Sequence, residues 1–170
     1  MKLKPTYKMQ FKRRRLGKTN YQKRLKLLMS KKPRLVVRKS LKYITAQVVE
    51  FDKTGDRTLV VASSQELKKH GWKFAFDNLP AAYLTGLMIG KKIVKVGIKE
   101  IFLDAGLYPS TKGSRVYAVA KGVIDSGVKM AVSADVLPTE ERIKGSHISN
   151  YLEKFRSLTE EFEKIKQKVK

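Results

Sequence analysis

Residues 33–51 read PRLVVRKSLKYITAQVVEF and carry the clearest structural pattern in this 170-residue chain. Residues 35–37 form one short apolar run and residues 44–49 form another, and both are rich in β-branched side chains. Such runs are typical of strands, and Ser40, Leu41 and Lys42 link them over a distance that suits a tight turn. The pattern therefore predicts a β-hairpin.

Polar side chains decorate this hairpin. Basic residues crowd its first strand and turn, and its second strand adds a ring and an amide: Arg34, Arg38, Lys39, Lys42, Tyr43 and Gln47. A surface of this kind suits a nucleic-acid backbone. Edge strands also often carry Lys and Arg, which protect them against the addition of another strand. The hairpin alone leaves both interpretations open.

Charge is distributed unevenly along the chain. Lys and Arg total 38 against 15 Asp and Glu, for a formal charge of +23. Residues 1–42 hold 17 of these basic residues and no acid, so residues 43–170 carry only +6. The pattern predicts a polyanionic partner and a basic, nucleic-acid-binding extension on a nearly ordinary globular body.

Composition excludes several other classes of protein. Cysteine is absent, which excludes disulfides, thiolate catalysis and Cys-ligated zinc. No apolar run approaches the length of a membrane span, and the N-terminus lacks the apolar core of a secretory signal, so we expect a cytoplasmic protein without a cofactor. A basic N-terminus could also be an organellar transit peptide, but those are Ser-rich and this arm has only Ser30.

The N-terminal arm, residues 1–32, interleaves cations with aromatic residues. Self-repulsion should keep its first fifteen or so residues extended until phosphates neutralise them. Tyr21, Leu25, Leu28 and Met29 then fall at helical spacing, which predicts a basic helix that ends before Pro33. That helix could pack on the body, lie on RNA, or do both.

Beyond the hairpin, the sequence predicts an α/β body. The turn DKTGD at 52–56 leads into a third strand at 57–63, which completes a three-stranded antiparallel meander. Further elements are expected as a helical turn at 65–69, a helix at 78–96, a strand at 98–103, a helix at 114–126 and a short strand at 128–132. These strand–helix units extend the meander into a mixed sheet with packed helices.

The C-terminal part, residues 138–170, is predicted as a helical extension. A short helix should begin after Pro138 and end at Gly145. From Ile148 onward apolar residues recur every three or four positions, which predicts an amphipathic C-terminal helix that docks on its own domain or on a neighbour. The expected organisation is thus an RNA-binding extension at 1–32, an α/β RNA-binding domain at 33–137 and this extension.

Lys112, Ser114 and Arg115 lie at the expected start of the helix at 114–126. Free N–H groups at such a helix end can bind an anion, and Ser and Arg would assist. The order Lys-Gly-Ser differs from the Gly-Lys-Ser/Thr of a nucleotide-binding loop. An ordinary capped helix is the simpler interpretation.

Several motifs together resemble a known family. FKRRR and GKTNY in the arm, PRLVVRKSLKYITAQVV in the hairpin, and GWK, NLPAAYLTGL, LDAGL and KGSRVYA further on resemble the archaeal and eukaryotic form of the L-eighteen family of large-subunit ribosomal proteins. The resemblance implies a non-enzymatic protein that binds 5S rRNA and helps attach it to large-subunit rRNA in the central protuberance. It also implies a neighbour of the L-five family and other central-protuberance proteins, with neither a membrane nor a homo-oligomer.

The resemblance also implies which residues contact RNA. By position these are Phe11, Lys12, Arg13, Arg14, Arg15, Tyr21, Arg24, Arg34, Arg38, Lys39, Ser40, Lys42 and Tyr43, together with the Lys112, Ser114 and Arg115 turn. Arg38 and Tyr43 depart from the aromatic and His that are common in the bacterial hairpin. Both substitutions keep a phosphate-binding or stacking role.

Two other functions fit parts of the sequence. A meander followed by helices also describes ribonuclease H-like enzymes, whose paired metals would need acids such as Asp52, Asp56, Asp104 and Asp135. Asp52 and Asp56 flank a Gly turn where Asp is common for local reasons, and the first strand is basic where this chemistry requires an acid. A basic module that binds membranes or anionic proteins is the third possibility.

Overall fold

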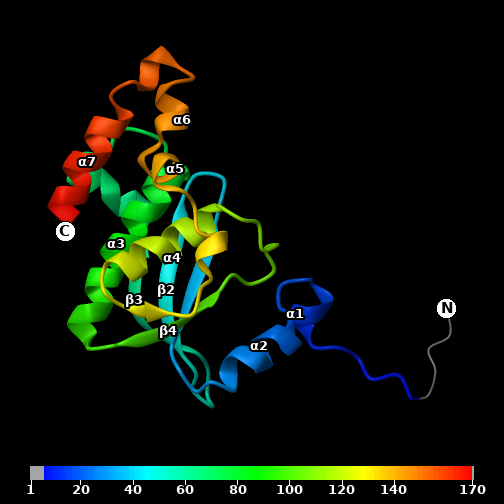
Figure 1. Cartoon of the computed structure of the whole chain (residues 1–170). Coiled ribbons are helices and arrows are strands. Elements are labelled where there is room, and N and C mark those ends of the chain that lie inside the picture. Colours follow the sequence, from blue (N-terminus) through cyan, green and yellow to red (C-terminus); the bar gives the residue numbers. More distant parts are fainter. Residues whose placement is uncertain (1–5, 170) are drawn as a thin grey trace.

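The computed structural model describes residues 6–169, and a five-stranded mixed sheet forms its centre. The strands are β1 (Arg34–Lys39), β2 (Ile44–Glu50), β3 (Arg57–Ser63), β4 (Glu100–Asp104) and β5 (Lys129–Met130), in the order β3-β2-β1-β4-β5. β1, β2 and β3 are antiparallel, whereas β4 runs parallel to β1 and β5 parallel to β4 (Figure 1). The α/β fold, the hairpin and the meander predicted from sequence are confirmed.

The hairpin turn is closed by hydrogen bonds between Ser40 and Tyr43. The Ser40 N–H donates to the Tyr43 carbonyl over 2.8 Å, and the Tyr43 N–H donates to the Ser40 hydroxyl over 2.9 Å. The Tyr43 ring packs 5.8 Å from the ring of Phe76, measured between centroids. These contacts hold the tip of the hairpin in one conformation.

Two helices cover one face of the sheet and form the core with it. They are α3 (Leu79–Val96) and α4 (Arg115–Asp125), which lie across the strands in Figure 1. Alternate residues of the hairpin, including Leu35, Val37 and Ile44, are fully buried in the same core as these helices. The other set of alternate residues therefore points to the opposite side, which we call the outer face.

Helix ends follow the signals in the sequence. The Asn78 side chain accepts a hydrogen bond from the Ala81 N–H over 2.9 Å at the start of α3, and Gly97 ends that helix with a φ of 82°. A 3-10 helix, η1 (Ser64–His70), ends in the same way at Gly71. A second short one, η2 (Ala134–Val136), precedes α5 (Glu140–Lys144), which ends at Gly145.

The C-terminal region differs from its prediction. Instead of one helix from Ile148, the chain forms α6 (Ser146–Ser149), a 3-10 turn η3 (Glu153–Phe155) and α7 (Leu158–Val169). Tyr151 and Leu152 between them are exposed, so their apolar spacing does not produce a buried stripe. After this break α7 packs against α3, where the ring of Phe162 lies 5.8 Å from that of Tyr83.

Two smaller differences involve short segments. The strand predicted at 128–132 is reduced to the two residues of β5. The arm forms two helices, α1 (Lys12–Arg15) and α2 (Tyr21–Leu28), and α1 was not predicted. Its single turn is held by a contact between the rings of Phe11 and Tyr21, 5.2 Å apart. The first five residues of the arm lie outside the described part of the chain.

Candidate nucleic-acid interface

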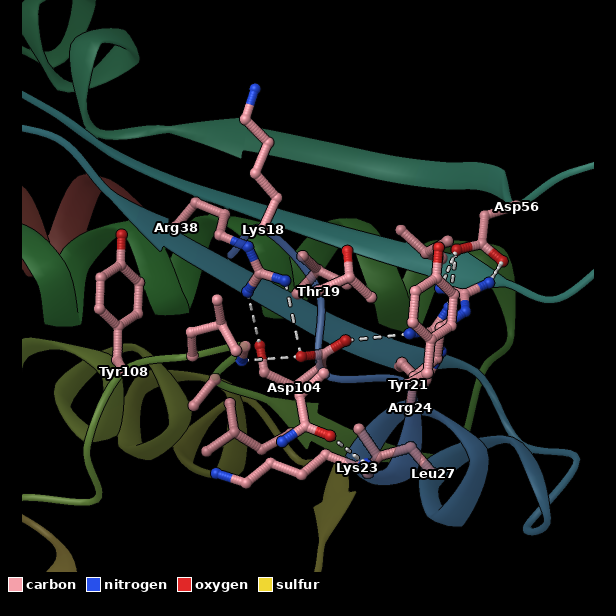
Figure 2. Close-up of a pocket in the computed structure, with 18 of the residues that line it drawn as sticks. Lys18, Thr19, Tyr21, Lys23, Arg24, Leu27, Arg38, Asp56, Asp104 and Tyr108 are labelled. Atoms are coloured by element: carbon pink, nitrogen blue, oxygen red, sulfur yellow. Dashed lines mark hydrogen bonds and ion pairs between the residues drawn. The ribbon is translucent and has the colours of Figure 1, made fainter. Parts of the chain in front are cut away.

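The arm returns to the outer face of the sheet and encloses a groove of about 920 Å³ with it. The sheet contributes Arg34, Val36 and Arg38 from β1, and Gln47 and Val49 from β2. Helix α2 and the loop after β4 form the other walls, as Figure 2 shows. We call this space the arm groove.

Cations dominate the lining of the arm groove. Seven basic residues line it, against two acids: Arg13, Lys18, Lys23, Arg24, Lys26, Arg34 and Arg38, with Asp56 and Asp104. Four of the seven come from the predicted RNA-contact set, and Lys18, Lys23 and Lys26 join them only in three dimensions. A concave surface with this excess of positive charge attracts polyanions.

Helix α2 presents one side to the groove. The Asn20 side chain caps the helix by accepting a hydrogen bond from the Lys23 N–H over 3.1 Å. Tyr21, Arg24 and Leu27 are spaced three residues apart, and all three line the groove (Figure 2). The basic helix predicted from sequence is therefore confirmed, and it packs on the body.

A continuous chain of ion pairs joins α2 to the sheet. Arg24 donates two hydrogen bonds to the carboxylate of Asp56, each 2.7 Å long. Arg34 donates to Asp56 and to Asp104 over 2.9 Å each. Arg38 donates to the Asp104 carbonyl over 3.0 Å and pairs with its carboxylate at 3.5 Å. We call these five residues the arginine–aspartate chain.

The hydrogen bonds between Arg24 and Asp56 shift the pKa of both groups. The hydrogen bonds from Arg24 hold the pKa of the Asp56 carboxyl below its ordinary value of 3.8, although partial burial opposes that shift, and the charges of Arg24 and Arg34 lower it further. The same bond raises the pKa of Arg24. Both groups therefore stay ionised at neutral pH.

Within the arginine–aspartate chain, Arg34 and Arg38 occupy different environments. The Arg34 side chain is only 2% exposed and lies beneath the groove, with its guanidinium bound to both acids. The Arg38 side chain is 46% exposed beside the groove. Both were predicted as RNA contacts, but only Arg38 presents a cation at the surface.

The tip of the hairpin forms a second basic surface. Lys39 lies over the ring of Tyr108 with its Nζ 4.8 Å from the centroid, and the Tyr108 hydroxyl donates to the Lys39 carbonyl over 2.9 Å. Ser40 and Lys42 are exposed at the turn, and Leu41 between them is 96% exposed. Tyr108 was not among the predicted site residues, and it connects this tip to the arm groove.

The remaining predicted contacts are spread over two places. Phe11, Lys12, Arg14 and Arg15 are exposed around α1. Lys112, Ser114 and Arg115 lie at the start of α4 and do not line the groove. There Arg115 donates to the Asp77 carbonyl over 2.7 Å and to its carboxylate over 2.9 Å.

Sequence reasoning missed the two acids of the chain. Asp52 does act locally, because it accepts a hydrogen bond from the Thr54 hydroxyl at 3.0 Å. Asp56 instead bonds to Arg24, 32 residues away, so its assignment to local turn geometry was wrong. The signal was indirect: a buried strand position occupied by Arg34 requires a carboxylate from elsewhere.

The acids invoked for a nuclease are placed differently from a metal site. Asp56 and Asp104 bind guanidinium groups. Over residues 6–169, His, Asp and Glu form no group of three or more that could hold a metal ion. In the same described range, no helix is long and apolar enough to cross a membrane.

Comparison with known proteins decides the family. Residues 5–102 match the family described as ribosomal large subunit proteins 60S L5, and 50S L18. The chain belongs to this family. It is 51% identical over 148 residues to the large ribosomal subunit protein uL18 of Korarchaeum cryptofilum (strain OPF8), a match that covers 87% of this chain and 76% of that protein.

Family membership confirms the resemblance seen in the sequence. The chain is a structural protein of the large ribosomal subunit, of the archaeal and eukaryotic type, and ribosomal RNA is its partner. The matched residues run from the arm to β4, so they include every member of the arginine–aspartate chain except Asp104, which lies two positions beyond them.

Proposed function

We propose that this protein binds 5S rRNA and helps attach it to large-subunit rRNA in the central protuberance, next to a protein of the L-five family. The proposal combines the family with one observation, the arm groove. Two distant parts of the chain, the arm and the hairpin, contribute cations to one concave surface. A structured RNA can fill such a surface with its backbone.

The balance of charge in the groove supports a phosphate ligand. Both acids are occupied by the arginine–aspartate chain. Among residues 6–169, Lys18, Lys23 and Lys26 of the lining form no ion pair with an acid. Each of these three ammonium groups can therefore bind a phosphate without first breaking an ion pair within the protein. Such binding releases counterions from the RNA, which favours the complex.

We assign different roles to the predicted contact residues. The cluster at residues 11–15 and the lysines of the groove supply affinity through phosphate contacts. Arg38, Lys39, Ser40, Lys42 and Tyr43 form a rigid surface that recognises the shape of one RNA. Arg34 supports this surface from within the protein and does not contact RNA, because its guanidinium is buried.

The regions of the chain have separate roles in this proposal. Residues 1–32 act as the RNA-binding extension and 33–137 as the 5S rRNA-binding domain. Residues 138–170 form the helical extension, and Lys112, Ser114 and Arg115 provide a smaller secondary contact. In α4 itself, Arg115 is already paired with Asp77, so we rank this contact below the groove.

Binding constants for two RNAs test the proposal. The protein should bind 5S rRNA more tightly than an unrelated structured RNA of equal length, at one fixed salt concentration, because the nonspecific electrostatic term is then equal. Equal affinity for both RNAs would contradict a specific 5S rRNA function.

A pair of variants tests the division of roles. Arg38→Ala combined with Tyr43→Ala should reduce the preference for 5S rRNA. The loss of one stacked base should cost roughly 1 to 3 kcal/mol of binding free energy. Neutralising the arginines at residues 13–15 should lower affinity for both RNAs about equally. If the arm variant alone lost the preference, recognition would reside in the arm.

A further inference from the structure

Asp56 is an acid on a surface that faces a polyanion. A carboxylate at this place repels phosphates, so electrostatics alone disfavours it. Yet Asp56 accepts three hydrogen bonds from guanidinium groups, two from Arg24 of α2 and one from Arg34 of β1. It therefore joins the arm to the sheet at one point.

Helix α2 has little else to hold it on the sheet. It contains eight residues, none of them buried, and Leu25 is 63% exposed. An isolated helix of this length is unstable in water. Its apolar residues Tyr21, Leu27 and Leu28 are only half-buried, and the ring contact of Tyr21 is with Phe11 of the arm itself. The paired hydrogen bonds to Asp56 are thus its strongest directional contact.

We propose that Asp56 is a positioning residue for RNA binding, which fixes helix α2 over the outer face so that arm and sheet present their cations as one preformed groove. This inference rests on the proposed function. Loss of the contact would leave the groove assembled in only a fraction of molecules, and apparent affinity falls by that fraction. Asp56 acts through Arg24 and does not itself touch RNA.

The inference predicts an effect opposite to simple electrostatics. Removing an acid from an RNA-binding surface normally raises affinity, because it reduces repulsion. Asp52 provides a matched control, since it is exposed in the same loop and its carboxylate accepts a hydrogen bond from Thr54 rather than from an arginine. Asp56→Asn and Asp52→Asn change the net charge equally, so their difference measures what the contacts of Asp56 contribute beyond its charge.

Binding of 5S rRNA by the full chain should be measured for both variants at one salt concentration. We expect Asp52→Asn to bind as tightly as the wild type or tighter, and Asp56→Asn to bind about three- to tenfold more weakly. If Asp56→Asn bound as tightly as Asp52→Asn, or tighter, the inference would be overturned, because the carboxylate would then only compete with phosphate.

The same measurement separates this inference from the proposed function. A wild-type protein without preference for 5S rRNA overturns the function, whereas the order of the two Asn variants on either RNA still decides the role of Asp56. If Asp56→Asn fails to fold, Arg24→Lys replaces it, since Lys keeps the cation on α2 but cannot reproduce the paired hydrogen bonds to Asp56. Arg24→Lys should then bind 5S rRNA more weakly than the wild type, and unchanged affinity would overturn the inference.

A covalent bridge between α2 and residue 56 can replace the lost contact, and the affinity for 5S rRNA then shows whether the position of α2 matters. The chain contains no cysteine, so Arg24→Cys with Asp56→Cys creates a unique pair of thiols. One sample is bridged with a short bismaleimide and the other is capped with N-ethylmaleimide, which leaves the charges equal. The bridged protein should recover most of the lost affinity for 5S rRNA. Equal affinity of the bridged and capped samples would overturn the inference.

Discussion

Replacing Arg34 with Met tests whether this residue supports the fold. Met keeps an unbranched apolar stem in the buried position but removes the two hydrogen bonds that Arg34 donates, one to Asp56 and one to Asp104. A hydrogen bond between charged groups contributes about 1.5–3 kcal/mol, and an unpaired buried charge costs about 3–5 kcal/mol. Asp56 keeps Arg24, and Asp104 keeps Arg38 and the Gly106 N–H. We therefore expect the free energy of unfolding to fall by about 2–4 kcal/mol.

Urea unfolding monitored by fluorescence measures this loss. Trp72 is the only tryptophan and is 2% exposed, so its emission reports unfolding directly. Adding Asp104→Asn to Arg34→Met should recover part of the stability, because the second change removes the charge of a largely buried acid that has lost its closer arginine partner. A loss below about 0.5 kcal/mol in Arg34→Met, together with weakened RNA binding, would refute this reasoning and return Arg34 to direct RNA contact.

Three further outcomes follow from the geometry. Neutralising the three arginines at residues 13–15 should leave urea unfolding unchanged and make the salt dependence of RNA binding shallower, by about 0.7–0.9 per lost phosphate contact. Gly122→Ala should lower stability by about 1–3 kcal/mol in the same unfolding assay, because a Cβ there would lie 2.8 Å from the Leu87 backbone nitrogen at the crossing of α3 and α4. The contact between Asp56 and Arg24 should persist on acidification, because the pKa of Asp56 is lowered, and it should be lost only as pH falls below 3.8. NMR signals of α2 would follow this loss. Loss of the contact near pH 5 would contradict the direction of the pKa shift.

Sequence patterns predicted the elements whose burial repeats regularly. Burial alternates along the hairpin and recurs at helical spacing in α4, at Val116, Val119 and Val123. Helix α3 is instead buried continuously over residues 79–90, and its caps Asn78 and Gly97 mark its ends. The C-terminal region shows the limit of this method, because the spacing of Tyr151 and Leu152 continues a helical pattern that tertiary packing does not use. The spacing of apolar residues shows which of them could be buried on one face of a helix. The tertiary packing of the chain decides which of them are buried.

The candidate interface was predicted less completely. Cations are visible in a sequence as a cluster, and the arm and the hairpin were both identified from that clustering. Which cations face RNA depends on the acids that neutralise some of them, and those acids come from distant loops. Asp56 and Asp104 reach Arg34 over 22 and 70 residues, and nothing in the local pattern predicts either pairing.

Directed cleavage of bound RNA tests most directly whether the RNA occupies the arm groove and the hairpin tip. Because the chain lacks cysteine, single Cys residues can carry an iron chelate that generates hydroxyl radicals at chosen places. Lys18→Cys lies in the groove, Leu41→Cys at the hairpin tip and Val94→Cys on the exposed side of α3. We predict strong cleavage of 5S rRNA at distinct sites from the first two positions and only background from the third. Cleavage from position 94, with none from positions 18 and 41, would contradict the account.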